Sequence, residues 1–379
     1  MVIFKKIFFL LVVYFLSFIF IREIIANNRQ WVPNRLFVNH HQYNHTLSPN
    51  FPPDVMHEDD LDLVRNYGNL KNYKINSLGL RENDEIILPK PKKEFRILVV
   101  GDSFVMAGLK ILDKLETRLN TVYGNDQIVF NIINCGQSSY SPMIHLARLK
   151  HQLLGLDPDT IIYLPDLTDV YDDTHRYLWL AKYDEDGKLD RVKPSTRIFR
   201  AKRRHKRKIN HFLQKIGLAT QKIRYVRSPK AKEHKYFQIF DHAKEDEKNP
   251  SQYTEQELSL TLGFIKDYIE IARSNKIHLS ITMYPHLAQI IPENKVYSTG
   301  FDSLYNRLFE RRVQELAQKE DILFKSFYEP ISQSVLSGKR LYLDNDMHFN
   351  DIGFDFMADL VTEWVVRNPQ KSIGFAPQK

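Results

Sequence analysis

The chain has 379 residues, of which 43% are hydrophobic and 26% charged, and this composition excludes an intrinsically disordered protein. Its single cysteine, Cys135, excludes an internal disulfide, and the apolar residues around it predict a buried thiol. The net charge of +8 is local, because ten lysines and arginines fall within residues 191–208.

The N-terminus carries an apolar segment, Ile7–Ile21, preceded by two lysines. We expect residues 1–26 to be a membrane anchor, which the lysines orient with its start in the cytoplasm. The alternative is a cleaved signal peptide ending at Ala26, although Ile24 is bulky where cleavage sites prefer a small residue. Both interpretations place the rest of the chain on the extracytoplasmic side.

Residues 27–92 form a predicted linker and lead-in segment. Residues 27–60 are rich in Asn, His and Pro, which predicts poor order, and their histidines, such as His45, are expected to titrate without consequence.

From residue 93 the pattern becomes that of an α/β domain, because short apolar runs alternate with amphipathic segments of helical length. This alternation predicts a parallel sheet covered by helices on both faces, in a domain over residues 93–368 with a tail at 369–379. The predicted strands are 95–100, 127–133, 159–164, 277–284 and 322–327, and the predicted helices are 109–123, 142–154 ending at Gly155, 254–274, 303–319 and 350–366.

A basic insert interrupts the pattern at about residues 183–253, where some helix is expected, for example over 209–222. Its basic run, 191–208, predicts an anionic surface as partner, such as phospholipid or acidic polysaccharide. The alternative is a solvated insert without a partner. We expect no nucleic acid, since no nucleic-acid-binding motif accompanies the run.

Four short segments carry the candidate chemistry, at the sheet edge where open α/β sheets place their sites. Gly101-Asp102-Ser103 follows the first strand of the domain; the Gly permits a tight turn, and the Ser then starts a helix, where backbone N–H groups stabilise negative charge. The others are Asn134-Cys135-Gly136-Gln137, Asp166-Leu167-Thr168-Asp169, and the run from Asp344 to Asn350 with His348.

Together these segments resemble the SGNH or GDSL-type hydrolase family over roughly residues 95–366, apart from the insert. The resemblance implies a three-layer sandwich with a mostly parallel, about five-stranded flavodoxin-like sheet. It also implies that Ser103 is the nucleophile, that His348 is the general base, and that the backbone N–H groups of Ser103 and Gly136 bind the oxyanion. Such acyl transfer needs no metal and no cofactor.

The chain departs from the family pattern at two positions. Thr168 stands where the family has an oxyanion-binding Asn; a Thr hydroxyl can donate one hydrogen bond but has a shorter reach. The family often separates the orienting Asp from the His by two residues, a spacing that is absent here. We assign Asp346 as the orienting acid, because many anchored members carry Asp-Gly-His, with Asp344 as the fallback.

These residues predict an exported serine esterase that cleaves acyl esters, including O-acetyl esters, on a cell-surface glycan or lipid. One alternative is an O-acyltransferase using the same site. Another is a non-catalytic glycan- or lipid-binding module that has kept the fold, which Thr168 supports. The segment Asn76-Ser77-Leu78-Gly79-Leu80-Arg81 resembles one that precedes the catalytic domain in anchored members, and we expect it to pack on the domain rather than contact substrate.

Overall fold

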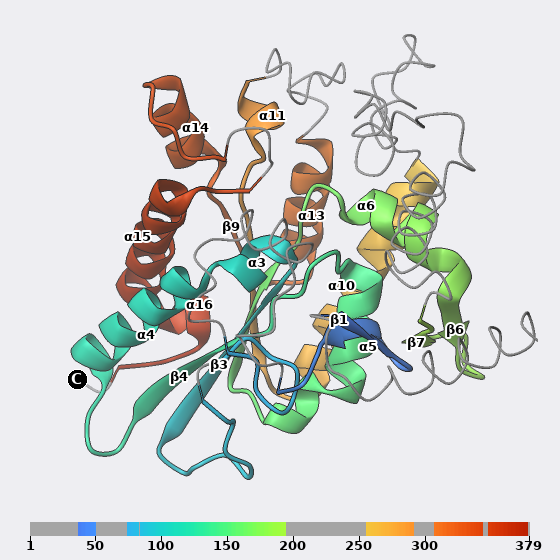
Figure 1. Cartoon of the computed structure of the whole chain (residues 1–379), viewed down its shortest axis with the longest axis horizontal. Helices are drawn as coiled ribbons and strands as arrows, with labels where there is room; N and C mark the ends of the chain where they lie inside the picture. Colours follow the sequence, from blue (N-terminus) through green and yellow to red (C-terminus); the bar gives the residue numbers. More distant parts are fainter. Residues whose placement is uncertain are drawn as a thin grey trace, which may run out of the picture.

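The computed structural model describes residues 37–50, 74–82, 84–194, 255–291, 307–343 and 348–377 (Figure 1). The predicted anchor and most of the basic insert, including the helix expected over 209–222, lie outside these residues. Within them, no helix has both the length and the apolar character needed to cross a membrane.

A five-stranded parallel sheet forms the centre of the domain, in the order β4-β3-β5-β8-β9 (Figure 1). In the middle of the sheet, Leu98 of β3 lies between Ile133 of β4 and Ile161 of β5. All three side chains are fully buried, as expected for a parallel sheet that helices cover on both faces. The expected α/β sheet is therefore confirmed, and it is parallel throughout. The strands are β3 (Glu94–Gly101), β4 (Val129–Asn134), β5 (Thr160–Leu164), β8 (His278–Met283) and β9 (Leu323–Ser326).

Helices form a layer on each face of this sheet, and each layer has its own apolar core. One core joins the sheet to α5, α10 and α13, and the other joins it to α4, α14 and α15. The longer helices are α4 (Leu109–Tyr123), α5 (Pro142–His151), α10 (Glu255–Ser274), α13 (Leu308–Lys319), α14 (Tyr328–Leu336) and α15 (Asp351–Arg367). Short helical turns are α3 (Ser103–Ala107), η4 (Leu153–Leu156), α6 (Asp169–Tyr171), η5 (Asp172–Tyr177), η6 (Leu178–Leu180), α11 (Leu287–Ile290) and α16 (Pro369–Ile373).

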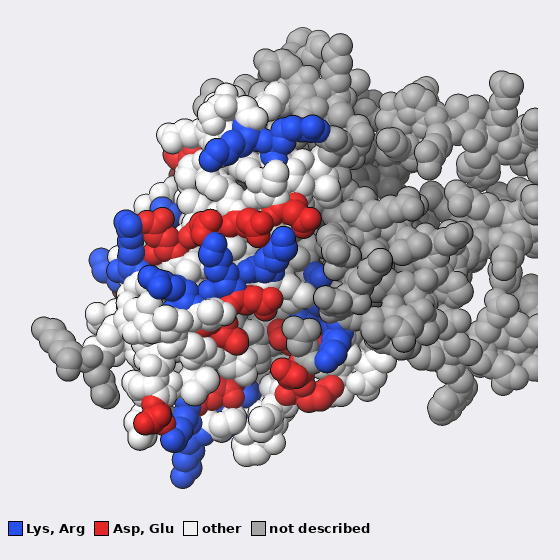
Figure 2. Space-filling model, turned by 60° about the vertical axis from the view of Figure 1, so that its left-hand side comes forward, with Lys and Arg blue, Asp and Glu red and all other residues white. Residues whose placement is uncertain are grey.

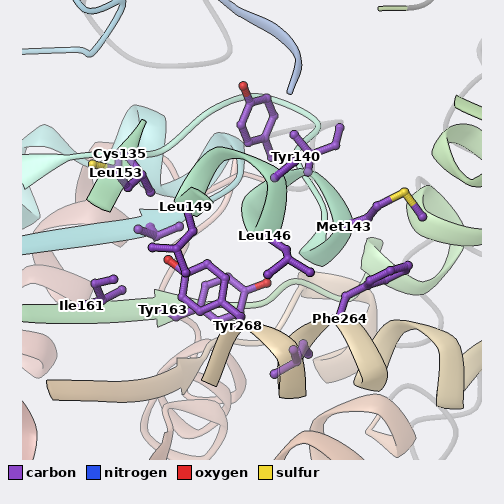
Figure 3. Packing of buried hydrophobic residues seen from close by; sticks show 14 of the residues in the cluster. Cys135, Tyr140, Met143, Leu146, Leu149, Leu153, Ile161, Tyr163, Phe264 and Tyr268 are labelled. Carbon is purple, nitrogen blue, oxygen red and sulfur yellow. The ribbon is translucent and has the colours of Figure 1, made fainter. Parts of the chain in front are cut away.

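The first of these cores centres on two tyrosines (Figure 3). The ring of Tyr163 on β5 stacks on the ring of Tyr268 on α10, with centroids 4.9 Å apart and an interplanar angle of 15°. Leu146 and Leu149 of α5 lie beside this stack (Figure 3) and are fully buried. Free Cys135 belongs to the same core, and the expectation of a buried thiol is confirmed.

The helix predicted to end at Gly155 ends earlier. Helix α5 stops at His151, and Gly155 lies inside the 3₁₀ turn η4 that follows. Asp157 closes this turn with φ +53°, a left-handed conformation that Asp tolerates better than most residues. The apolar periodicity continues across this change of helix type, which explains the longer prediction.

The expectation of a poorly ordered linker is wrong for residues 37–50. Strands β1 (Phe37–His40) and β2 (Asn44–Leu47) form an antiparallel hairpin, and every residue of β2 is buried. His45 is also buried, with Nδ1 2.8 Å from Asn44 Oδ1 and Nε2 2.9 Å from the carbonyl oxygen of Ser138. It is therefore a structural histidine that joins the hairpin to the loop after β4. A second small hairpin, β6 (Ala181–Tyr183) with β7 (Leu189–Val192), opens the insert.

Residues 76–81 pack against the domain, as expected. The Asn76 side chain accepts the N–H groups of Leu78 and Leu80, each at 3.0 Å. Gly79 has φ +70°, and a Cβ atom there would lie 2.7 Å from the carbonyl oxygen of Leu47. The buried Arg81 guanidinium donates to the carbonyl oxygen of Met106 in α3. This segment therefore ties the first hairpin to the helix that follows Gly101.

The predicted tail also belongs to the folded domain, as far as residue 377. Ile373 in α16 is fully buried, and its carbonyl oxygen accepts the hydroxyl of Thr160. The Phe375 ring packs on Phe95 and Phe130, with centroids 5.6 and 5.0 Å apart. The prediction ended the domain too early because α15 carries the last long apolar periodicity.

Opposite charges alternate on the face that carries α4 and α15 (Figure 2). Lys110 lies 3.6 Å from both Asp351 and Asp355, and Lys114 pairs with Asp359. These exposed pairs contribute at most about 1 kcal/mol each, so their main effect is to balance the charge of this face. Most of the basic run lies outside the described residues, which include only its members Arg191 and Lys193.

Burial of His45 predicts a pH-dependent stability. Burial lowers the pKa of His45 to about 4, against an opposing effect of its hydrogen bond to Ser138. An unfolded histidine has a pKa near ~6.5, so the unfolded state binds the extra proton between these values. Stability from neutral His45 is complete above pH ~6.5 and decreases by about 3 kcal/mol as the pH falls to 4.

We therefore expect His45→Gln to flatten the pH dependence of the unfolding free energy by about this amount. Chemical denaturation at several pH values between 7 and 4 measures it. The control, His41→Gln, removes an exposed imidazole from the same hairpin. If wild type and His45→Gln lose stability in parallel, His45 is not the group responsible.

Candidate active site

Ser103 lies at the point where β3 turns directly into α3. A Cβ atom at Gly101 would overlap Val105 Cγ2 and lie 3.1 Å from the carbonyl oxygen of Leu164, so a side chain would crowd this turn. Asp102 caps α3, since its Oδ1 accepts the N–H of Phe104 at 2.9 Å. As the first residue of the helix, Ser103 has a backbone N–H without an acceptor inside the helix.

The structure brings His348 to Ser103 across 245 residues of chain. His348 Nε2 lies 2.7 Å from Ser103 Oγ, and both side chains are buried. The Phe104 ring packs on the His348 ring, with centroids 4.6 Å apart. Asn350 caps α15 by accepting the N–H of Gly353 at 2.9 Å, and this cap fixes the chain just after His348. The arrangement suits proton transfer from the hydroxyl to the imidazole.

The structure does not describe either candidate for the acid that orients His348. Residues 344–347 lie outside the described residues, and they include both Asp344 and Asp346. On either side of this gap, the Leu343 N–H donates to the His348 carbonyl oxygen at 2.9 Å. The role of Asp346 therefore stays a prediction.

The structure gives Gly136 a different part from the expected one. Its N–H donates to Asn134 Oδ1 at 2.9 Å, and Asn134 Nδ2 in turn donates to the carbonyl oxygen of Val105 at 3.0 Å. A Cβ atom on Gly136 would overlap the backbone of Met106. Glycine is thus required because the loop after β4 packs directly on α3, and its N–H is not directed at Ser103.

Thr168 also differs from the expectation. Both its N–H and its hydroxyl donate to Asp166 Oδ1, each at 2.7 Å. A hydroxyl has one proton, so this proton is committed to a carboxylate rather than to an oxyanion. Of the three expected oxyanion donors, the described residues leave only the Ser103 N–H without an acceptor.

A second histidine reaches the site, and sequence reasoning missed it. His286 follows β8, and its Nε2 lies 2.6 Å from Asp166 Oδ2. The Tyr284 hydroxyl lies 3.1 Å from Asp102 Oδ1 and 3.3 Å from Asp166 Oδ2, so it joins this pair to the start of α3. The signal was available, since Pro285-His286 directly follows the predicted strand 277–284, as Asp102-Ser103 follows the strand at 95–100.

Burial and charge move the two site carboxyl groups in opposite directions. Burial, helped by the nearby charge of Asp166, raises the pKa of Asp102 to about 7. Burial alone would also raise the pKa of Asp166, but the His286 ring and hydrogen bonds from His286 and Thr168 hold it at about 2. The described part of the chain holds no group of three or more His, Cys, Asp or Glu residues arranged to bind a metal ion.

Comparison with known proteins finds likeness at the level of solved structures only. No family model matches the sequence, and no curated protein matches it. A GDSL-like lipase from Bacteroides thetaiotaomicron is 14% identical, with a TM-score of 0.39, over 74% of this chain and 92% of its own. A lipase/acylhydrolase from Enterococcus faecalis is 11% identical, with a TM-score of 0.40, over 75% and 98%. An acetyl xylan esterase is 14% identical, with a TM-score of 0.42, over 72% and 98%. At these values the likenesses assign neither an activity nor a substrate to this chain.

The hydrogen bonds of Thr168 predict a structural effect of its removal. Thr168→Val takes one donor from the buried Asp166 carboxylate, which should cost about 1–3 kcal/mol of unfolding free energy. We expect kcat for an ester to fall less than about tenfold, because loss of an oxyanion donor would cost ~10²–10³. Thr168→Ser, which keeps the hydroxyl, is the control. A loss of activity above 100-fold at unchanged melting temperature would restore the oxyanion role.

Proposed function

We propose that the chain is a serine esterase whose nucleophile is Ser103 and whose general base is His348. The observation that carries this proposal is the distance of 2.7 Å between Ser103 Oγ and His348 Nε2 at the start of α3. A serine hydroxyl is a weak nucleophile until an adjacent base removes its proton, and a pair at hydrogen-bond distance meets that need. We propose Asp346 as the acid that orients His348, with Asp344 as the fallback.

The reaction follows from this geometry. His348 takes the proton as Ser103 Oγ attacks the ester carbonyl, and returns it to the leaving alcohol. The Ser103 N–H faces the resulting oxyanion at the positive end of α3. Water, activated by His348, then releases the acid from the acyl-enzyme. Because Gly136 and Thr168 donate elsewhere, we expect a lower turnover than in a site with three oxyanion donors.

We place the substrate at the cell surface, as an acyl ester, including O-acetyl, on a glycan or a lipid. The support is the sequence alone: the apolar segment Ile7–Ile21 would anchor the chain with its domain on the extracytoplasmic side. The basic run at 191–208 would hold an anionic surface close to the site domain. Fractionation with protease protection of the full-length chain tests the location, and a cytoplasmic domain would overturn it.

Replacement of the nucleophile tests the activity. In the full-length chain we expect Ser103→Ala to abolish labelling by a fluorophosphonate and to lower p-nitrophenyl acetate hydrolysis by at least about 10³-fold. His348→Ala should do nearly the same, since the two residues act as a unit. The control is Ser274→Ala, which removes an exposed hydroxyl at the end of α10.

The products separate this proposal from its alternatives. Release of free acid in the presence of an oligosaccharide supports hydrolysis, whereas acylated oligosaccharide would show transfer. A wild-type chain that neither reacts with the fluorophosphonate nor cleaves any ester contradicts the proposal and favours a binding module.

A further inference from the structure

Asp102 and Asp166 are buried carboxyl groups that share one hydroxyl donor, Tyr284 OH. They come from different strand ends, since Asp102 follows β3 and Asp166 follows β5. Two buried carboxylates this close repel each other, so a shared site favours one proton and one negative charge. The question is which of the two carboxyl groups holds the proton.

The hydrogen bonds place the charge on Asp166. Three donors serve Asp166 alone: the N–H and the hydroxyl of Thr168, and Nε2 of His286. The Tyr284 hydroxyl has one proton, which only one of the two carboxyl groups accepts at a time. Asp102 has one donor of its own, the Phe104 N–H at Oδ1. The Ser103 hydroxyl lies 3.3 Å from Oδ2, but its single proton is needed for the shorter contact of 2.7 Å to His348 Nε2. Hydrogen bonds to a carboxylate favour its ionised form, so Asp166, which has more donors, carries the negative charge.

The contacts of His286 determine which of its ring nitrogens donates a proton to Asp166. His286 caps α11, and its ring accepts the backbone N–H of Gln289. Its Nε2 lies 2.6 Å from Asp166 Oδ2. A neutral ring with the proton on Nε2 satisfies both contacts, because it accepts from Gln289 and donates to Asp166.

We propose that His286 and Tyr284 are positioning residues that hold the negative charge on Asp166, so that Asp102 stays protonated and orients the Ser103 hydroxyl. Asp102 Oδ1 already accepts the Phe104 N–H and faces the Tyr284 hydroxyl, which leaves the proton on Oδ2, 3.3 Å from Ser103 Oγ. Oγ then accepts from Asp102 and donates to His348 Nε2. The inference rests on the proposed function for its effect on catalysis, but not for the protonation state itself.

This arrangement also removes a charge from the place where an oxyanion would form. An ionised Asp102 next to Ser103 would repel the oxyanion and compete with His348 for the hydroxyl proton. The direction of the Asp102 pKa shift, which is upward, agrees with this assignment. The titratable groups of the described residues that interact with Asp102 are His348, Asp166, Asp169, Tyr163, Tyr284 and His286.

Infrared spectroscopy tests the protonation without relying on activity. In the difference spectrum between wild type and Asp102→Asn near pH 6, we expect the carbonyl band of a protonated carboxylic acid. The band should disappear from the wild type as the pH rises through about 7. A difference spectrum that shows only a carboxylate at pH 6 overturns the inference, whether or not the protein cleaves esters.

The His286 variants test the positioning role. His286→Leu removes the donor to Asp166, so the proton moves toward Asp166 and the Asp102 midpoint should fall by at least one pH unit. His286→Gln can still donate and accept, and should keep the midpoint near the wild-type value. If both variants only lower the melting temperature and leave the midpoint in place, His286 has a structural role alone.

The pH dependence of kcat/KM connects this network to the reaction. We expect the wild-type value to fall as Asp102 ionises, by up to about tenfold per pH unit. In Asp102→Asn, whose amide can donate to Ser103 Oγ at every pH, this fall should be absent. An Asp102→Asn variant that shows the same fall as the wild type contradicts the inference. Failure of the esterase proposal is recognised separately, by a wild type that is inactive at every pH.

Discussion

The site depends on the turn at Gly101, where the buried strand β3 ends and, after the single residue Asp102, helix α3 begins. Helix α3 has only five residues, so it gains little from its own hydrogen bonds and is held by its neighbours. Arg81 binds the carbonyl oxygen of Met106 near its end, and Asn134 binds that of Val105. Gly136 lets the neighbouring loop lie against its backbone. The position of Ser103 is therefore set by two other chain segments, the one that ends at Arg81 and the loop at 134–136.

The polar residues next to Ser103 form one connected hydrogen-bond network. Burying the Asp166 carboxylate would cost free energy if it had no hydrogen-bond donors, and Thr168 and His286 supply these donors. In this setting Thr168 is the partner of Asp166, which gives a physical reason for a threonine at this position. The site combines the short contact between Ser103 and His348 with the nearby charge of Asp166, which its own hydrogen bonds stabilise.

The sequence predicted the sheet from the alternation of apolar runs and amphipathic segments. The meeting of Ser103 with His348 was predicted from the resemblance to SGNH hydrolases. The sequence could not predict the part of Gly136. A glycine shows that a side chain is not tolerated, but the neighbour that excludes it becomes visible only in three dimensions. His45 was misjudged for a related reason, since composition describes the polar stretch around it and not the carbonyl group of Ser138 that it meets. The end of α5 was misplaced because apolar spacing does not distinguish an α-helix from a 3₁₀ turn.

The β1–β2 hairpin changes where the folded unit begins. Its strand β2 covers the loop after β4, and the Tyr140 hydroxyl donates to the carbonyl oxygen of His45. A shortened chain that starts after residue 60 would look safe from composition, yet it would leave Ser138 and Tyr140 without these partners and expose the surface beneath Leu47. A chain that keeps this loop intact must include residues 37–50, so this hairpin is part of the folded domain and not a spacer.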